Sequence, residues 1–177
     1  MTHDWRTTRP GTDEHHAYYA GYIAQVPDGD IIPMLGRQLE ESLRAWRAIP
    51  ESRGGYRYAE GKWSIKEVIS HLSDAERVFS YRALRAARND QSAVPGFDEN
   101  AFAKHSEADR RTMADLISEF EHLRRSNIAL FASFDDEAAR RRVTANGSPI
   151  TARALVWVIA GHELHHGRVL KERYLGA

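Results

Sequence analysis

Four long segments of the chain repeat apolar residues at steps of three and four, the period at which side chains line one face of an α-helix. These segments span residues 31–49, 64–89, 112–134 and 150–174. Strand-like sequence is confined to a short hairpin predicted around Asn146-Gly147, a dipeptide favoured in two-residue turns. Amphipathic helices bury their apolar stripes against one another, so the pattern predicts an all-α fold, a four-helix bundle.

Local signals mark where these helices begin and end. Ser64 and Glu67 have the spacing of a capping box, in which the serine oxygen accepts a backbone N–H and the glutamate reaches back. Pro50 ends the first helix. The connections over residues 50–63 and 90–111 are long enough for crossovers, so helices that follow one another in sequence need not be antiparallel neighbours.

The segment before the first long helix is rich in aromatic residues, with YYAGY at residues 18–22. We expect residues 14–25 to form a short helix or an extended N-terminal arm that packs these rings on the bundle. A chain of 177 residues is long enough for a hydrophobic core, and no repeat or second domain is visible. Residues 1–177 are therefore expected to form a single domain.

Composition excludes several classes of function. The net charge is zero with neutral histidines, which argues against nucleic-acid binding; we interpret Arg140-Arg141-Arg142 as a solvated helix end or loop. The chain has no cysteine, so any metal must be held by nitrogen and oxygen ligands. The first residues lack the apolar core of a signal peptide, and the longest apolar run, residues 154–160, is too short to span a bilayer. We expect a cytoplasmic protein with no membrane or nucleic-acid partner.

The stretch GHELHH contains His162, Glu163 and His166 in the H-E-x-x-H pattern of zinc metalloproteases. The two histidines are four residues apart, which places them on one helical face about 6 Å apart. The protease reading fails on its third ligand, because Val169 and Glu172 occupy the positions where one zincin class needs glycine and histidine. Glu163 is about 100° around the helix from His162, so we expect it to form a salt bridge or a helix cap.

A third metal ligand is expected from an earlier helix. His71 lies in the middle of the second segment on an apolar face, between Val68 and Leu72, where a buried imidazole needs a partner. The alternative is that these histidines are ordinary core or surface groups, and His165 is a possible substitute ligand. Five other histidines are surrounded by polar residues and are expected at the surface: His3, His15, His16, His105 and His122.

Several segments together resemble the DinB/YfiT-like superfamily: KWSIKEVISHLSDAERVFSYRALR, PGFDENAF and NGSPITARALVWVIAGHELHH. The resemblance implies an up-down-down-up four-helix bundle in which His71, His162 and His166 bind a divalent metal, most often zinc or nickel. Members are described as metal-dependent hydrolases, and others are thiol transferases and isomerases that use bacillithiol, mycothiol or glutathione. Many are dimers, so a homodimer is a possible state of this chain.

These observations leave three functions open. The leading one is a metal-dependent S-transferase that joins a low-molecular-weight thiol to a small-molecule substrate. The alternatives are a hydrolase that uses a metal-bound hydroxide and a non-catalytic metal-binding protein of a stress or damage response. The same three histidines serve each of them.

Candidate groups beside the metal site come from the same helix as His71. Asp74 is expected to orient His71 or an incoming group, and Arg82 to bind a carboxylate of a thiol cofactor or to be a paired buried residue. Glu76 and Arg77 are near His71 on the same helix but point away from the apolar stripe, so a surface ion pair and a supporting role at the site are equal alternatives. Trp63 and Tyr81 either line the pocket or pack against the bundle.

Overall fold

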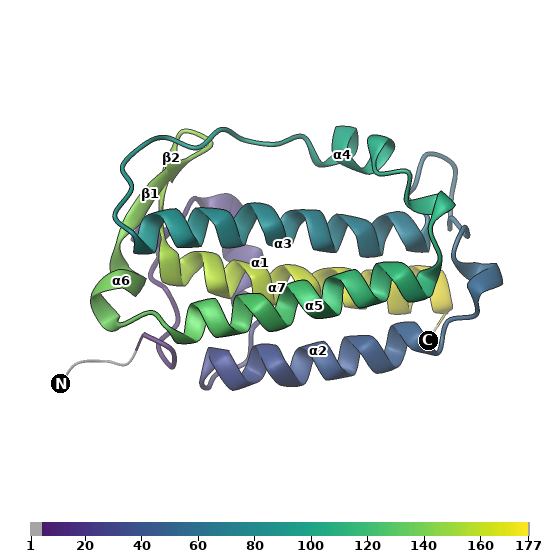
Figure 1. Ribbon diagram of the computed structural model, residues 1–177, viewed down its shortest axis with the longest axis horizontal. Helices are drawn as coiled ribbons and strands as arrows, with labels where there is room; N and C mark the ends of the chain where they lie inside the picture. Colours follow the sequence, from purple (N-terminus) through teal and green to yellow (C-terminus); the bar gives the residue numbers. More distant parts are fainter. Residues whose placement is uncertain (1–4, 177) are drawn as a thin grey trace.

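A computed structural model of the chain describes residues 5–176, and four long helices lie side by side along its long axis (Figure 1). They are α2 (Ile31–Arg47), α3 (Ile65–Ala87), α5 (Met113–Ala132) and α7 (Ala152–Val169). The predicted four-helix bundle is confirmed, and the helices begin and end within a few residues of the predicted bounds. The largest difference is at the C-terminus, where Leu170–Leu175 continues α7 as a π-helix. No helix in the described part of the chain is both long and apolar enough to cross a membrane.

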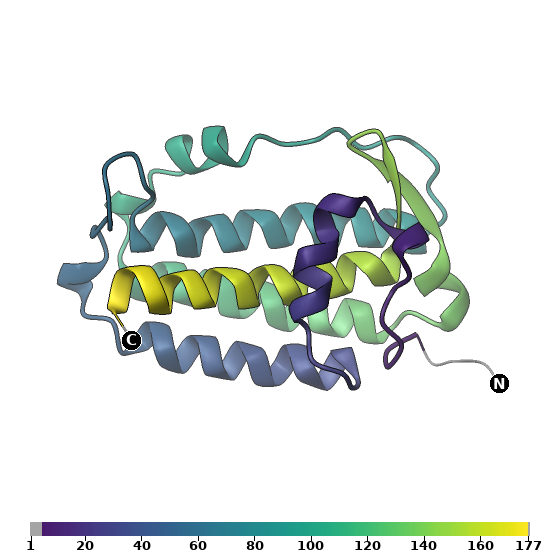
Figure 2. The same cartoon turned by 180° about the vertical axis from the view of Figure 1, so that it is seen from behind.

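The four helices follow the up-down-down-up order. Helices α2 and α7 run in one direction, and α3 and α5 run in the other (Figures 1 and 2). Because α3 and α5 are parallel, the connection between them returns along the whole bundle, and it carries the short helix α4 (Glu99–His105). Neither α4 nor the five-residue helix α6 (Asp136–Arg140) was predicted, since elements this short show too few helical turns for a clear apolar period.

The predicted hairpin lies between α6 and α7. Strand β1 (Arg142–Ala145) pairs antiparallel with β2 (Ser148–Thr151). Asn146 and Gly147 both have positive φ, 50° and 75°, as the mirror-image two-residue turn requires. A parallel bridge joins Val94 to Ala145, so the hairpin also holds the connection that leaves α3.

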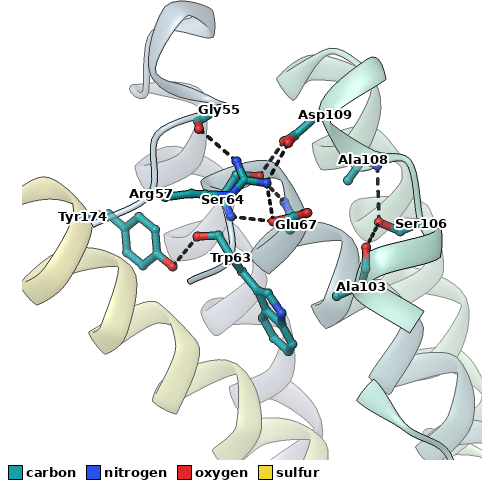
Figure 3. Close-up of polar contacts among 10 residues, drawn as sticks. All are labelled: Gly55, Arg57, Trp63, Ser64, Glu67, Ala103, Ser106, Ala108, Asp109 and Tyr174. Carbon is teal, nitrogen blue, oxygen red and sulfur yellow. Dashed lines mark hydrogen bonds and ion pairs between the residues drawn. The ribbon is translucent and has the colours of Figure 1, made fainter. Parts of the chain in front are cut away.

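Helix α3 begins in a network of hydrogen bonds (Figure 3). The predicted capping box is present: Glu67 N donates to Ser64 Oγ, and the Glu67 carboxylate accepts from Ser64 N at 2.7 Å. Ser64 also donates to Asp109, and Arg57 donates to both Glu67 and Asp109, each at 2.9 Å. The Tyr174 hydroxyl donates to the carbonyl of Trp63 at 2.8 Å. These bonds fix the position of Trp63, which directly precedes the N-cap Ser64, and its indole lies against the histidines described below.

Helix α7 is the centre of the bundle, since every residue from Ala152 to Glu163 is buried. It packs on α3 along one side and on α1 (Ala20–Gln25) along another. A helix that is buried all round must satisfy every polar side chain it carries with a partner inside the protein.

One such partner is Arg124 of α5, which is 1% exposed. It donates two hydrogen bonds to Glu76 of α3, at 2.7 and 2.8 Å, and one to Glu163 of α7, at 2.5 Å. Ser42 of α2 donates to the other oxygen of Glu163 at 2.6 Å. This charge cluster joins all four long helices. The prediction that Glu76 forms a surface ion pair is wrong, because its partner is a buried arginine on another helix; the neighbouring Arg77 does pair at the surface, with Glu119.

The predicted N-terminal arm is present as two 3₁₀ turns, Thr12–Glu14 and Ala17–Tyr19, followed by α1. It is anchored by Glu14, which accepts hydrogen bonds from Arg153 and Thr151. Although burial would raise the pKa of Glu14, the bond from Arg153 holds it at about 2. The prediction that His15 lies at the surface is wrong, because this anchor buries it with Glu14. His3 lies outside the described residues.

Replacing Arg124 with Met should destabilise the protein by about 3–5 kcal/mol, because it leaves two buried carboxylates without their cation. The free energy of unfolding in urea measures the effect. Arg125→Met is the matched control, since Arg125 is exposed and forms only surface ion pairs; it should change stability by less than about 0.5 kcal/mol. Equal losses in the two variants would contradict the structural role given to the cluster.

Candidate metal centre

Helices α3 and α7 bring three histidines together. His71 comes from α3, and His162 and His166 come from successive turns of α7. The Nε2 atoms of His71 and His162 are 3.1 Å apart, and each of the three residues offers a nitrogen within 4.8 Å of the others. The three ring centroids are separated by 4.6 to 5.0 Å.

This arrangement fits a divalent metal ion. Zinc binds histidine nitrogen at about 2.0–2.1 Å, so ligands at two corners of a tetrahedron lie about 3.3 Å apart, close to the spacing of the two Nε2 atoms. Burial lowers the pKa of His71 to about 4 and that of His166 to about 3, and it lowers the pKa of His162 as well. All three imidazoles are therefore neutral at physiological pH, which is the form that binds a metal.

Aromatic rings hold the imidazoles in place. The Trp63 ring lies 4.7 Å from His71 and is nearly parallel to His166 at 6.5 Å, with 19° between the planes. Tyr22 from the N-terminal arm packs edge-on against His162 at 5.4 Å. His71 Nδ1 has no hydrogen-bond partner among the described residues, so on that side of the ring packing rather than a polar contact holds it.

The structure does not place Asp74 at the site. It is absent from the lining of the pocket that contains the histidines, and it makes no hydrogen bond to His71. Its carboxylate lies 3.9 Å from Arg77, one helical turn further along α3. Burial raises the pKa of Asp74.

The histidines lie in the wall of a pocket of 510 Å³, a volume typical of small-molecule sites. The arm, α3, α7, the connection after α3 and the hairpin all contribute to it. Trp63 and Arg82 line this pocket, whereas Tyr81 is 52% exposed and is not among its lining residues. His165 also lines the pocket but is not part of the group of three.

The H-E-x-x-H sequence does not form a protease site here. Both oxygens of Glu163 are already bound, one by Ser42 and one by Arg124. The carboxylate is 1% exposed and is held in the bundle core by these two bonds. The predicted salt bridge of Glu163 is present, although it is buried rather than superficial.

The contribution of the arm was only partly visible in the sequence. The aromatic run predicted packing on the bundle, but nothing in it indicated that Tyr22 would contact His162 and His165. The contact depends on Gly161, because a Cβ there would lie 2.1 Å from the Tyr22 carbonyl oxygen. Only glycine lets α1 approach α7 this closely, next to a histidine of the site.

Gly161→Ala should therefore push α1 away from α7 and destabilise the protein by about 1–3 kcal/mol. Urea unfolding gives the free energy, and hydrogen exchange over residues 17–25 reports release of the arm. Gly167→Ala on the same helix is the control, because nothing lies within 4 Å of its Cβ. It should be neutral or stabilising by up to about 1 kcal/mol. Unchanged exchange in Gly161→Ala would contradict the close contact.

The lowered histidine pKa values also predict how the metal-free protein responds to acid. Unfolded histidine has a pKa of about 6.5, so the unfolded state binds more protons than the folded state as pH falls below that value. The contribution of neutral His71 to stability is complete above about pH 6.5 and is lost progressively toward pH 4. Urea unfolding between about pH 7.5 and 5 should show a shallower decline for His71→Gln than for the natural protein. His122→Gln, at an exposed position, should leave the decline unchanged.

Comparison with known structures places this fold among related proteins. YfiT from Bacillus subtilis, described as "a probable metal-dependent hydrolase with an unusual four-helix bundle topology", aligns with a TM-score of 0.70 and 16% identity, covering 96% of this chain and 94% of YfiT. A mycothiol-dependent maleylpyruvate isomerase aligns with a TM-score of 0.65 and 15% identity, over 82% of this chain and 61% of the isomerase. The DinB-like protein YjoA from Bacillus subtilis gives 0.60 and 20%, over 83% of this chain and 92% of YjoA.

At these identities the structural matches show a shared fold. A comparison with curated proteins gave no match. The sequence itself matches the DinB superfamily over residues 34–170, which include all four long helices except the first residues of α2 and contain the three histidines. The chain belongs to the DinB superfamily.

Proposed function

We propose that this protein is a metal-dependent enzyme that transfers a low-molecular-weight thiol to a small electrophilic substrate. The observation that carries the proposal is a group of three neutral imidazoles, two buried and one half-buried, in the wall of a pocket with room for another molecule. His71, His162 and His166 would hold the ion, for which zinc and nickel are the leading candidates because both accept neutral imidazole ligands. A divalent ion there would lower the pKa of a bound thiol, whose thiolate is the reactive form.

The surrounding residues would orient the reactants and limit access of water. Trp63 and Tyr22 cover the imidazoles, and Phe79 extends the aromatic wall away from them, 5.8 Å from His162. Three protein ligands leave at least one position for a reactant, as in catalytic rather than structural metal sites. The pocket itself argues against a purely metal-storing protein, which has no use for a cavity of this size.

Hydrolysis is the second candidate, because the same metal would activate a water. The description of YfiT as a probable metal-dependent hydrolase supports it, and the thiol dependence of the maleylpyruvate isomerase supports thiol chemistry. The two reactions differ in their need for a base. The buried carboxylates nearest the histidines, Glu76 and Glu163, are both bound to Arg124, so neither is free to take a proton from water. A bound thiol must also lose a proton, but its ordinary pKa of about 8.5 lies far below the value of about 15.7 for water, so it depends less on a base, and this difference favours thiol transfer.

Metal content is the first test. Elemental analysis of the untagged protein should find about one zinc or nickel ion per chain, and His162→Ala should lose it. His165→Ala is the matched control: this residue lines the same pocket outside the group of three and should leave the metal in place. A protein that takes up no metal, even after dialysis against zinc or nickel, would rule out both reactions.

Activity distinguishes the two reactions. The metal-loaded protein should conjugate bacillithiol, mycothiol or glutathione to a fluorogenic bimane, and removing the metal should lower the rate by at least about 100-fold. Metal-dependent release of nitrophenol from activated esters, without any thiol-dependent rate, would support the hydrolase instead.

A further inference from the structure

Arg82 is a buried cation without an anionic partner. It is 2% exposed, and no carboxylate among the described residues lies within ion-pair distance of it. Its Nη2 donates to the carbonyl of Pro95 at 2.9 Å, and its guanidinium carbon lies 5.9 Å from the Phe79 ring. Its Nε has no hydrogen-bond partner. A buried charge is costly unless a group of opposite charge compensates it, and the partners of Arg82 are neutral, the Pro95 carbonyl and the Tyr19 hydroxyl, so this guanidinium is suited to an anion.

The contrast with the other buried arginines is informative. Arg124 binds two carboxylates and Arg153 binds Glu14, so this chain pairs buried guanidinium groups with acids where they are purely structural. Arg82 differs from both in that it lines the pocket. Its neighbours there, the Phe79 ring and the Tyr19 phenol, carry no charge; burial raises the pKa of Tyr19, which keeps it neutral.

The position of Arg82 relates it to the three histidines. The Phe79 ring is close to both groups, 5.9 Å from the Arg82 guanidinium and 5.8 Å from the His162 ring, and all three residues line the pocket. A ligand of a few carbon atoms along this ring can therefore reach both groups. A planar guanidinium binds the two oxygens of a carboxylate better than any other side chain does.

We propose that Arg82 forms a carboxylate-binding subsite beyond the Phe79 ring, so that the ligand taken by this pocket carries a carboxylate a few carbon atoms from the atom that reacts at the histidines. The statement that this ligand reacts at the histidines rests on the proposed function. The carboxylate belongs either to the thiol or to its electrophilic partner, and both sources share the chemistry that Arg82 recognises.

Glu99 is the competing explanation. It lines the same pocket and is partly exposed, but it forms no ion pair with Arg82 in the described structure. If Glu99 moved to neutralise Arg82 in solution, the subsite would be closed to other carboxylates. The variant Glu99→Gln would then create carboxylate binding that the natural protein lacks.

The first arm of the test needs no metal. Calorimetric titration of the full-length, metal-free protein should show hexanoate binding at least about tenfold more tightly than hexanol, because a charge-assisted hydrogen bond distinguishes the two ligands. Arg82→Gln should abolish the preference, Arg82→Lys should retain part of it, and the exposed Arg88→Gln on the same helix should retain all of it. Thermal melting establishes that each variant is folded. If Arg82→Gln does not fold, the reduced preference of Arg82→Lys for hexanoate and the comparison of hexanoate with hexanol in the natural protein still test the subsite.

The second arm identifies the source of the carboxylate. In cobalt-loaded protein, the thiolate-to-cobalt absorption band reports binding of mercaptohexanoate and mercaptohexanol. A carboxylate on the thiol predicts that mercaptohexanoate binds at least about tenfold more tightly and that hexanoate competes with it. A carboxylate on the partner predicts that mercaptohexanol and hexanoate bind together.

Three results would overturn the subsite: equal binding of hexanoate and hexanol to the natural protein, a preference that survives in Arg82→Gln, or hexanoate binding that appears only in Glu99→Gln. Failure to bind cobalt or zinc would instead count against the proposed function, and the metal-free titration would still report on Arg82. The two conclusions therefore fail by different measurements.

Discussion

The burial of helix α7 on all sides constrains most of this structure. Its sequence carries Arg153 into the core near its start, and His162 and Glu163 further on at adjacent positions about 100° apart around the helix. Each needs a partner from a different direction, because an unsatisfied buried polar group is costly. Glu163 obtains Arg124 and Ser42, which ties α5 and α2 to α7. His162 faces His71 of α3. The register of the bundle is thus tied to the chemistry of its site, since sliding any helix would break one of these contacts.

The same helix also controls how the site is covered. Gly161, directly before His162, allows α1 to lie against α7, and the close approach brings Tyr22 over the imidazoles. The arm is held at its other end by the buried pair of Glu14 and Arg153, and Arg153 again belongs to α7. One helix therefore supplies two of the three histidines, the contact surface for the cover and its anchor. Because α7 supplies both of these contacts, the N-terminal arm folds back onto a helix that lies at the other end of the chain.

The sequence predicted what depends on local order and missed what depends on partners far away in the chain. Apolar periodicity identified the four long helices, the capping box at Ser64 was correct, and the Asn146-Gly147 turn was correct. The grouping of His71 with His162 and His166 followed from helical spacing and was supported by resemblance; the structure brings them together. The surface position expected for Glu76 was wrong because its partner, Arg124, is 48 residues away on another helix. Apolar periodicity predicts that both residues are helical, but it does not show which faces of two helices meet.

Charge distinguishes the two candidate reactions further. Three neutral imidazoles would leave both charges of a divalent ion uncompensated, and Arg82 adds another positive charge to the same pocket. The Arg124 cluster behind His162 offsets only part of this charge, because its two carboxylates and one guanidinium leave at most a single net negative charge. Within a partly dehydrated cavity such an excess strongly favours anionic ligands. A thiolate that carries its own carboxylate, or a thiolate beside a carboxylate-bearing electrophile, would balance more of these charges than a single hydroxide beside a neutral ester. The distribution of buried charge therefore agrees with the proposal of thiol transfer at this site.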